Sequence, residues 1–280
     1  MGTGLEVLTT GLVERGGGFQ LVDGIENSDI SFPDDGLSKL YDIEEESYWF
    51  KHRNVCFGHL VNKYSGGGVF LDIGGGNGVV SKALQDDGLE VVLVEPDPIG
   101  CRNAVERGVS NVFSGTLEDL PLRPGIEVPS IGVFDVLEHI DDDLAALEGF
   151  YSVLSEGGHL FLSVPAFNFL WSEEDVHAGH FRRYTKRSIT EVVERVGFEI
   201  VEVGYLFSVL CIPILIMRSI PSWFGFYKVQ GETVNRDHGS SGGLVSRFVS
   251  RRLKSEFNRL KSGSGKMVGS SLYLVARKTG

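Results

Sequence analysis

Short runs of apolar residues alternate along this chain with segments in which apolar residues recur every three or four positions. Val69–Ile73, Glu90–Glu95 and His159–Val164 are mainly apolar runs of the kind that fills the centre of a parallel sheet. Val79–Leu84, which follows the first run, has the periodicity of a helix. The alternation predicts an α/β fold, with helices packed on both faces of a parallel sheet.

A glycine-rich turn joins the first of these strands to its helix. The turn reads DIGGGNG and holds Gly74, Gly76 and Gly78. Glycine lets the backbone turn sharply and approach a ligand closely, and the helix that follows directs its first amides into the same corner. The dinucleotide pattern GxGxxG would need a further glycine at Val79 or Ser81, so the spacing argues against a pyrophosphate.

Two acidic residues flank this corner. Asp72 precedes the glycines, and Glu95 closes the next strand, at a position where a ribose diol is commonly bound in such folds. A carboxylate in front of the turn favours an ammonium group over a phosphate. An adenosyl ligand that carries an amino acid tail fits both acids.

With these residues in place, the chain resembles the class I S-adenosylmethionine-dependent methyltransferases of the type 11/23 branch, from about Tyr48 to Lys278. The family's landmarks occur in order at Leu71–Gly78, Glu95, Gly115–Pro121, Phe134–His139 and Leu154–Gly158. The resemblance implies S-adenosylmethionine as cofactor and a Rossmann-like, doubly wound sheet of seven strands. The last strand is expected to be antiparallel, with Phe198–Val203 and Ser271–Ala276 as the closing pair.

The resemblance also assigns the cofactor-binding residues. Asp72, the three glycines and Glu95 are expected to bind the cofactor. Thr116 and Leu117 correspond to the loop beside the adenine, although Thr116 stands where the family usually has an acid. Phe134 ends the fourth strand, and Arg53 is expected to meet the carboxylate of the cofactor through a charge-assisted hydrogen bond.

The segment Ser172–Thr185 carries the clearest chemistry outside the cofactor site. An acid followed by Gly-His-x-Arg-Arg-Tyr forms part of the acceptor side of the pocket in the matching methyltransferases, and Asp175, His180, Arg183 and Tyr184 fit that pattern. His180 is the first choice of general base, because the pKa of histidine lies near neutrality. Asp175 would orient it, and Tyr184 would be a hydrogen-bond donor or a wall for the acceptor.

Two other interpretations of this segment stay open. It could only anchor its loop to the sheet, with Arg183 paired to an acid at positions 173–175. Asp175, His177 and His180 could also bind a metal ion, but without further converging carboxylates we expect no metal site. His139, at the start of a helix, is expected to fix its loop rather than to act in catalysis.

The chain divides into four parts by pattern. Residues 1–45 are expected to be an appendage, in which Leu5–Ile25 forms two strands around Arg15–Gly18 and Pro33 breaks the polar stretch that follows. The methyltransferase core spans 46–204 and begins with an aromatic-rich helix from Tyr48 to about Tyr64. A helical insertion spans 205–267, and 268–280 supply the final strand.

The insertion contains two distinct segments. Tyr205–Met217 is almost wholly apolar but too short to span a bilayer, and Pro213 interrupts it. Leu244–Lys261 is a basic amphipathic helix, with Arg247, Arg251, Lys254 and Lys261 opposite Val245, Val249, Leu253, Phe257 and Leu260. The insertion is therefore either a lid over the acceptor pocket or a lid that also contacts a membrane surface through 205–261.

Composition narrows the function further. The chain has 280 residues, of which 26 are basic and 38 acidic, so its net charge of -12 argues against nucleic acid as a partner. The three cysteines are widely spaced and form no CxxC pair, which is typical of a reduced protein without structural zinc. No basic and then apolar N-terminal stretch is present, and we expect a cytoplasmic protein, with the membrane surface as the alternative.

The expected activity is direct methyl transfer to a small-molecule or amphiphilic acceptor, such as a lipid-linked sugar or an isoprenoid. Positioning and exclusion of water supply much of the rate of such a displacement. A non-catalytic S-adenosylmethionine-binding scaffold is the alternative, and the polar segment from Asp175 to Tyr184 argues against it. A nucleotide-dependent oxidoreductase is disfavoured by the glycine spacing.

Overall fold

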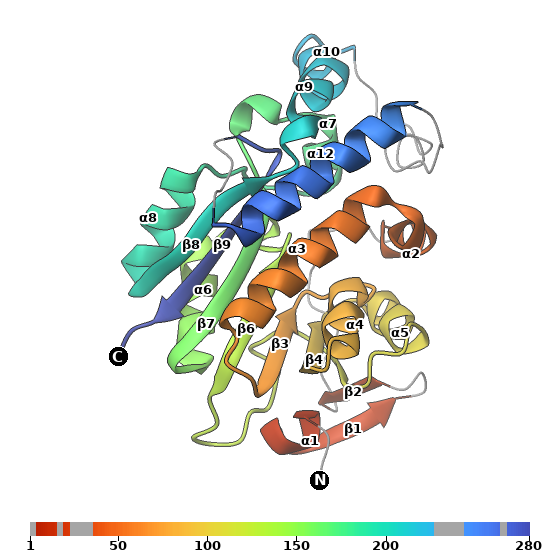
Figure 1. Cartoon of the computed structure of the whole chain (residues 1–280). Helices are drawn as coiled ribbons and strands as arrows, with labels where there is room; N and C mark the ends of the chain where they lie inside the picture. Colours follow the sequence, from red (N-terminus) through yellow and green to blue (C-terminus); the bar gives the residue numbers. More distant parts are fainter. Residues whose placement is uncertain (1–3, 16–18, 23–35, 227–243, 264–267) are drawn as a thin grey trace.

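One nine-stranded sheet organises the residues that the computed structural model describes, 4–15, 19–22, 36–226, 244–263 and 268–280 (Figure 1). Its order is β1-β2-β5-β4-β3-β6-β7-β9-β8. The strands are β1 (Leu12–Arg15), β2 (Phe19–Val22), β3 (Val69–Ile73), β4 (Glu90–Glu95), β5 (Val112–Ser114), β6 (Val128–Phe134), β7 (Leu154–Pro165), β8 (Phe198–Leu206) and β9 (Ser271–Lys278).

The neighbouring strands from β2 to β7 are parallel, and β9 is antiparallel to both β7 and β8. The predicted antiparallel last strand is thus confirmed, as is the Rossmann-like fold class. The sheet is larger than the expected seven strands, because β1 and β2 form a hairpin that pairs with β5 and extends the edge.

Helices cover both faces of the sheet, as the sequence pattern predicts (Figure 1). Residues of α6 and α8 pack in the core on one face, and residues of α3 and α4 on the other. The helices that precede the insertion are α1 (Gly4–Leu8), α2 (Gly36–Glu46), α3 (Tyr48–Tyr64), α4 (Val79–Asp86), α5 (Pro98–Glu106), the 3-10 turn η1 (Leu137–His139), α6 (Asp143–Val153), the 3-10 turn η2 (Asn168–Leu170), α7 (Glu173–His177) and α8 (Lys186–Val196).

The direction of winding changes at β3. The chain passes from β3 to β4 on one side, whereas β6 lies on the other side of β3. In open α/β sheets, a crevice opens at the carboxyl ends of the strands where the order reverses. Ile73, Glu95 and Phe134 are the last residues of these three strands, and the motifs of the sequence follow each of them.

The N-terminal segment differs in part from the prediction. The hairpin around Arg15–Gly18 is present, but Leu5–Leu8 form a helical turn instead of a strand. Leu5 and Leu8 are spaced by three residues and both are buried in the core, which fits one face of a helix. The polar stretch around Pro33 lies outside the described residues. The aromatic-rich helix is confirmed as α3, and the Ser47 hydroxyl caps it by accepting from the amide of Trp49.

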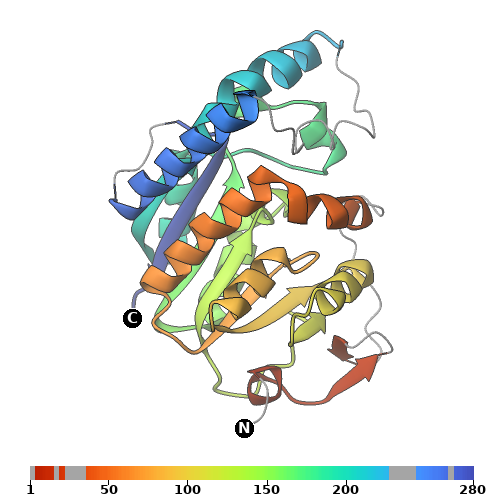
Figure 2. The ribbon, with the colours of Figure 1, turned by 45° about the vertical axis from the view of Figure 1, so that its right-hand side comes forward.

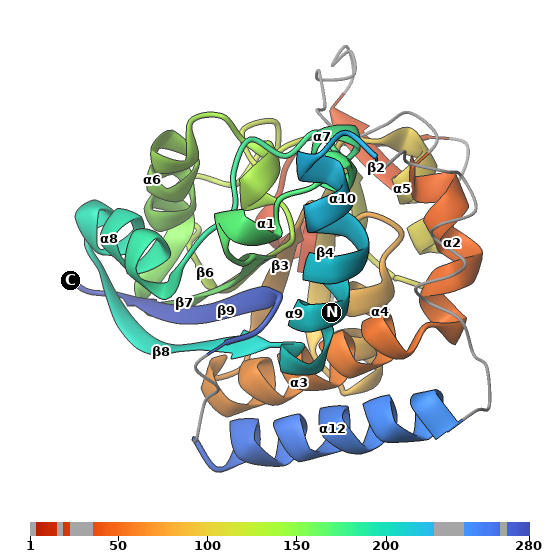
Figure 3. The same ribbon diagram turned by 90° about the horizontal axis from the view of Figure 1, so that it is seen from above.

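The insertion begins with one helical stretch made of η3 (Ser208–Leu210), α9 (Cys211–Ile214), the π-helical turn η4 (Leu215–Ser219) and α10 (Ile220–Trp223). It continues with α12 (Leu244–Lys261), whose bounds match the predicted basic helix. Leu253 and Leu260 of α12 are buried, and its four predicted cations are exposed. The side chain of Val245 lies outside the described part. Figure 3 shows α12 packed on the outer side of α3, as a further layer beyond the sheet.

A buried glutamate fixes α12 to the core. Glu256 accepts hydrogen bonds from the amides of Phe207 (2.7 Å) and Ser208 (3.0 Å), and one of its oxygens lies 3.1 Å from Nε2 of His52 on α3. Burial acts to raise the pKa of this carboxyl, but the bonds from His52, Ser208 and Phe207 outweigh burial and hold the pKa below its usual value. Glu256 therefore joins α12, α3 and the start of the insertion.

We expect Glu256→Gln to lower the free energy of unfolding by about 3 kcal/mol, because the neutral amide leaves part of this buried donor set unpaired. Urea denaturation at neutral pH measures the loss. Glu199→Gln is the matched control, since Glu199 forms a half-exposed ion pair with Arg277 and should cost less than about 1 kcal/mol. Equal losses in the two variants would contradict the anchoring role of Glu256.

Candidate active site

A cavity of about 1220 Å³ opens at the carboxyl ends of β3, β4 and β6. Nine of the residues expected from the sequence line it: Arg53, Asp72, Gly74, Gly76, Glu95, Thr116, Leu117, Phe134 and His180. No described residue of 205–267 belongs to the lining. The expected lid over this cavity stays a prediction, since the described part of the insertion adds no side chain to the cavity wall.

The glycine turn forms the floor of the cavity. Gly74 and Gly78 have positive φ angles of 67° and 76°, a region that favours glycine. A Cβ atom on Gly74 would lie 2.6 Å from the side chain of Val136, and one on Gly78 would lie 2.8 Å from the Cβ of Ala104. Gly78 itself does not line the cavity; its role is to let α4 start close to α5.

Asp72 and Glu95 are buried carboxylates on this floor. The hydroxyl of Ser81 donates to Asp72 at 2.6 Å, yet burial raises the pKa of Asp72 to about 6. The amides of Gly76 and Asp97 donate to the two oxygens of Glu95, each at 2.8 Å, and burial still raises the pKa of Glu95 to about 7. In both groups burial outweighs the hydrogen bonds that the protein supplies, so a cationic or hydroxyl-bearing ligand would add donors that these carboxylates lack.

Arg53 lies beside these acids but already has a partner. Its Nη1 donates to Oδ2 of Asp135 at 2.6 Å, and its guanidinium lies 4.9 Å from the ring centre of Trp49. Asp135 follows β6 with a φ of 57°, a strained value for a residue other than glycine, and also accepts from Ser163. The expected contact of Arg53 with a cofactor carboxylate stays a prediction, and it would have to coexist with the Asp135 pair.

The loop after β5 supplies another wall. The amide and the hydroxyl of Thr116 both donate to Oδ2 of Asp119 at 2.8 Å. Asp119 thus provides an acid in the loop where Thr116 replaces the usual one, and it holds Thr116 at the cavity. Phe134 stacks on Phe57 with ring centres 4.3 Å apart and contributes an apolar surface.

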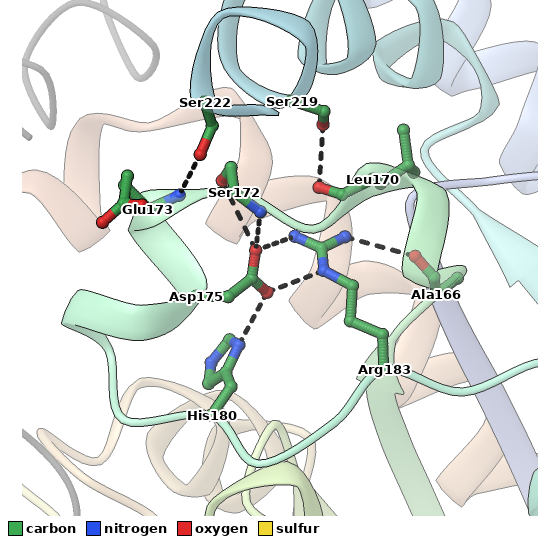
Figure 4. Close-up of polar contacts among 9 residues, drawn as sticks. All are labelled: Ala166, Leu170, Ser172, Glu173, Asp175, His180, Arg183, Ser219 and Ser222. Carbon is green, nitrogen blue, oxygen red and sulfur yellow. Dashed lines mark hydrogen bonds and ion pairs between the residues drawn. The ribbon is translucent and has the colours of Figure 1, made fainter. Parts of the chain in front are cut away.

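On the opposite side, Asp175 organises the segment that the sequence marks for the acceptor (Figure 4). Its carboxylate binds Nδ1 of His180 at 2.9 Å and accepts from Nε and Nη2 of Arg183 at 2.6 and 2.9 Å. Burial acts to raise the pKa of Asp175, but the hydrogen bonds from His180 and Arg183 prevail and hold it at about 2. Arg183 also donates to the carbonyl of Ala166, which directly follows β7, and so ties the segment to the sheet.

The residues of this segment therefore have two different roles: one faces the cavity, and the others anchor the segment. Only His180 reaches the cavity, whereas Asp175, Arg183 and Tyr184 lie behind it. Tyr184 is buried in the core and its hydroxyl donates to Asp143, so it does not present a donor or a wall to an acceptor. His177, from the alternative metal set, is exposed on α7.

Glu138 and His139 also line the cavity, beside His180. The rings of His139 and His180 are 4.7 Å apart, and the three residues bring one donor atom each to within 4.8 Å of one another. Oε2 of Glu138 is buried and has no hydrogen-bond partner among the described residues. Burial and then the charge of Asp135 raise the pKa of Glu138, and burial and His180 lower the pKa of His139 to about 4.

The sequence predicts that Phe134 and Asp135 face the crevice and that His139 fixes its loop, but it assigns no binding or catalytic role to Asp135, Glu138 or His139. A signal for them is their position directly after β6, since polar residues at the carboxyl end of a central strand face the crevice. The donor atoms of Glu138, His139 and His180 are close enough to hold an acceptor group or a divalent cation between them.

Comparisons with known proteins agree with this geometry. Residues 47–203 match the model of a methyltransferase domain family, type 23. A probable S-adenosylmethionine-dependent methyltransferase of Mycolicibacterium smegmatis is 27% identical over 173 residues, which cover 61% of this chain and 66% of that protein. A ubiquinone biosynthesis O-methyltransferase of Vibrio vulnificus is 24% identical over 147 residues, 50% of this chain and 63% of that protein.

The chain thus spans just under two thirds of the length of these curated relatives. Among solved structures, phosphoethanolamine N-methyltransferase 2 of Haemonchus contortus, in complex with S-adenosyl-L-methionine, superposes with a TM-score of 0.53. It is 17% identical, and the match covers 89% of this chain and 58% of that one. This likeness shows the shared fold.

Disrupting the Asp175 hub should destabilise the protein in a pH-dependent way. The pKa of Asp175 is about 2 in the folded protein, below its ordinary value of 3.8. The charged carboxylate therefore stabilises the fold fully above pH 3.8, and this stabilisation is lost as pH falls toward 2. We expect Asp175→Asn to cost about 3 kcal/mol at neutral pH, because it breaks a buried pair with Arg183.

Urea denaturation of both proteins across pH measures this difference in stability. It should narrow below about pH 4, where the carboxyl of the unfolded wild type begins to take up a proton, until the folded carboxyl does so near pH 2. Asp141→Asn is the control, because Asp141 pairs with Arg182 at the surface and should cost little. A gap that stays constant down to the lowest measurable pH would refute the assignment.

Proposed function

We propose that this chain, which belongs to the methyltransferase domain family whose model matches more than half of it, methylates a hydroxyl group. The hydroxyl group belongs to an amphiphilic acceptor, and His180 is the general base. S-adenosylmethionine is its cofactor and supplies, when bound, an electrophilic methyl group on a positively charged sulfur. The observation that carries the proposal is the 2.9 Å bond between His180 and Asp175, which fixes the imidazole at the edge of the cavity.

The residues on the cavity floor fit this cofactor. Asp72 and Glu95 are the groups that would hold its ammonium and its ribose hydroxyls, because both are carboxylates whose charge is poorly compensated by the protein. Gly74 leaves its backbone open to close approach, and Leu117 and Phe134 offer apolar surface to the adenosyl group. Thr116 and Asp119 would serve the adenine side.

The protonation state of His180 follows from its neighbours. A carboxylate with a pKa of about 2, bound by Arg183, can only accept, so Nδ1 of His180 must carry the hydrogen of the bond to Asp175. In the neutral ring, Nε2 then keeps its lone pair. That nitrogen is available to take the proton from an acceptor hydroxyl, as a general base does.

The surroundings of His180 support a hydroxyl acceptor that carries an apolar part. His139 lies against His180, and burial lowers its pKa to about 4. Burial and the charge of Asp135 raise the pKa of Glu138, and its buried Oε2 has no hydrogen-bond partner among the described residues, so both side chains can hydrogen-bond to an acceptor oxygen. Leu37, Phe50, Ala146 and Phe150 add apolar lining to the same cavity. The relatives named as ubiquinone biosynthesis O-methyltransferases support the same acceptor class.

We expect His180→Gln to lower the rate of methyl transfer by a factor on the order of 100 to 10,000, while S-adenosylmethionine still binds. The assay follows labelled methyl groups from S-adenosylmethionine into a cellular lipid extract, into a catechol with and without an alkyl tail, and into the matching alkylamine. Transfer confined to the amine would contradict a hydroxyl acceptor.

His177→Gln is the matched control, because His177 lies on the same segment but is exposed. Addition of a chelator distinguishes a general base at His180 from a metal site that includes His180. A wild-type rate that a chelator abolishes and a divalent cation restores would assign Glu138, His139 and His180 to a metal ion and overturn the role of His180 as base.

Asp72→Asn tests the cofactor site separately. We expect affinity for S-adenosylmethionine to fall by about tenfold to 100-fold, because a charge-assisted bond to the ammonium is lost. The wild-type affinity should also weaken more steeply than that of the variant as pH falls through about 6, because Asp72 takes up a proton there, whereas the variant keeps only the titration of Glu95 near pH 7. Calorimetry measures both.

The apo form of this variant should be at least as stable as the wild type, since it no longer buries a charge. Asp86→Asn, exposed on α4, is the control and should bind as the wild type does. Unchanged affinity of Asp72→Asn for S-adenosylmethionine would contradict the assignment of Asp72 to the ammonium group of the cofactor.

A further inference from the structure

Exposed apolar side chains gather on one segment of this protein. Fifteen large apolar residues are exposed among the described ones, and seven of them fall between positions 212 and 226: Ile212, Ile216, Met217, Ile220, Trp223, Phe224 and Phe226. Their exposed fractions run from 37% to 83%. Single exposed apolar residues are ordinary, whereas a contiguous group marks an interaction site.

The exposed apolar side chains lie on one face of a helical segment, and its other face is bonded to the rest of the protein. Cys211 and Ser219 are buried, and the Ser219 hydroxyl donates to the carbonyl of Leu170 at 2.9 Å. The hydroxyl of Ser222 accepts from the amide of Glu173 at 2.9 Å (Figure 4). The outward apolar face is therefore held in place by bonds to η2 and α7.

The elements beneath this segment widen the apolar surface. Phe169 of η2 and Val176 of α7 are also exposed, and both elements contact η4. The neighbouring stretch 227–243, which lies outside the described residues, contains only Tyr227, Val229 and Val234 as large apolar residues among its 17.

A strongly basic surface accompanies the apolar one. The described side chains of α12 place six cations at exposed positions, Arg247, Arg251, Arg252, Lys254, Arg259 and Lys261, and the one acid of the helix, Glu256, is buried. α12 contacts η3, which directly precedes the apolar segment, and Figure 1 shows α12, α9 and α10 in the upper part of the molecule, with the same ribbons uppermost in Figure 2. Phe248, exposed on α12, adds an aromatic ring.

We propose that the apolar face of 211–226 and the basic face of α12 together dock this protein on an anionic membrane surface. Apolar side chains enter the boundary between headgroups and acyl chains, and cations bind the anionic headgroups. The charge selects the partner and the orientation: a molecule of net charge -12 is repelled by anionic lipids except through this cationic side. Among the helices that the structure describes, none has the length and apolar content to cross a bilayer.

The docked segment is bonded to the acceptor side of the cavity. Ser219 and Ser222 hold η2 and α7, and α7 contains Asp175, which positions His180. An amphiphilic acceptor that rests in the bilayer would thus meet the cavity wall through its headgroup. This last step rests on the proposed function, whereas the docking itself does not.

The test uses the full chain and sedimentation with vesicles of phosphatidylcholine, with and without phosphatidylglycerol. We expect binding to the anionic vesicles alone, weakened by salt. Trp223→Ser with Phe224→Ser should reduce partitioning by at least about tenfold, and Arg247→Gln with Arg251→Gln and Lys254→Gln by about fivefold for each cation removed. Trp223 also reports insertion by a blue shift of its fluorescence, which Trp223→Phe should abolish.

The matched controls are Val13→Ser and Arg187→Gln, two exposed positions away from this surface, and both should bind as the wild type does. Unfolding curves verify that every variant is folded. Absence of vesicle binding by the wild type, or equal binding by all variants, would overturn the proposal. Light scattering could also overturn the proposal. If the wild type is a dimer, and Trp223→Ser with Phe224→Ser makes it a monomer, a second copy of the chain covers the apolar face.

Discussion

Removing carboxylates from water is the constraint that shapes this protein around its cavity. Asp72, Glu95, Glu138 and Asp175 are each at most 6% exposed, and the protein compensates them to very different degrees. Asp175 receives a guanidinium and an imidazole, and its pKa falls to about 2. Glu95 receives two amides and Asp72 one hydroxyl, and burial prevails in both. The poorly compensated carboxylates face the cavity, where a ligand can supply the missing donors, and the fully compensated one stands behind it as structure.

Local sequence patterns predicted the elements well because strands and helices here are set by short-range periodicity. The parallel core, the antiparallel last strand, α3 and α12 all follow from runs of apolar residues and from family landmarks. Features that depend on which way a side chain points were harder to predict. Tyr184 fits a motif as an acceptor wall yet turns into the core toward Asp143. His139 meets His180, and Arg53 meets Asp135, across 41 and 82 positions, distances at which no local pattern carries information. Leu5–Leu8, with too few residues to show a period, form a helical turn where a strand was expected.

The insertion between β8 and β9 links the periphery to the chemistry through a few polar bonds. Glu256 secures α12 against α3, and two serines of the apolar segment secure η2 and α7. Apart from the contact between Glu256 and His52, these bonds each pair a side chain with a backbone group: the amides of Phe207 and Glu173 and the carbonyl of Leu170. The insertion is thereby coupled to the acceptor side of the cavity through α7, and to α3, which carries Arg53, through His52 and through the stacking of Phe207 on Trp49.

The position of β9 has a consequence for biosynthesis. β9 is the last strand along the chain, yet it lies between β7 and β8, and β8 pairs with no other described strand. While the ribosome makes the insertion, β7 and β8 therefore present open edges toward each other, with their common partner still missing. Open edges invite pairing with other chains. Helices of the insertion that form early would have to pack on a sheet that is still incomplete. The sheet becomes continuous from β7 to β8 only when Ser271–Lys278 pair with both strands.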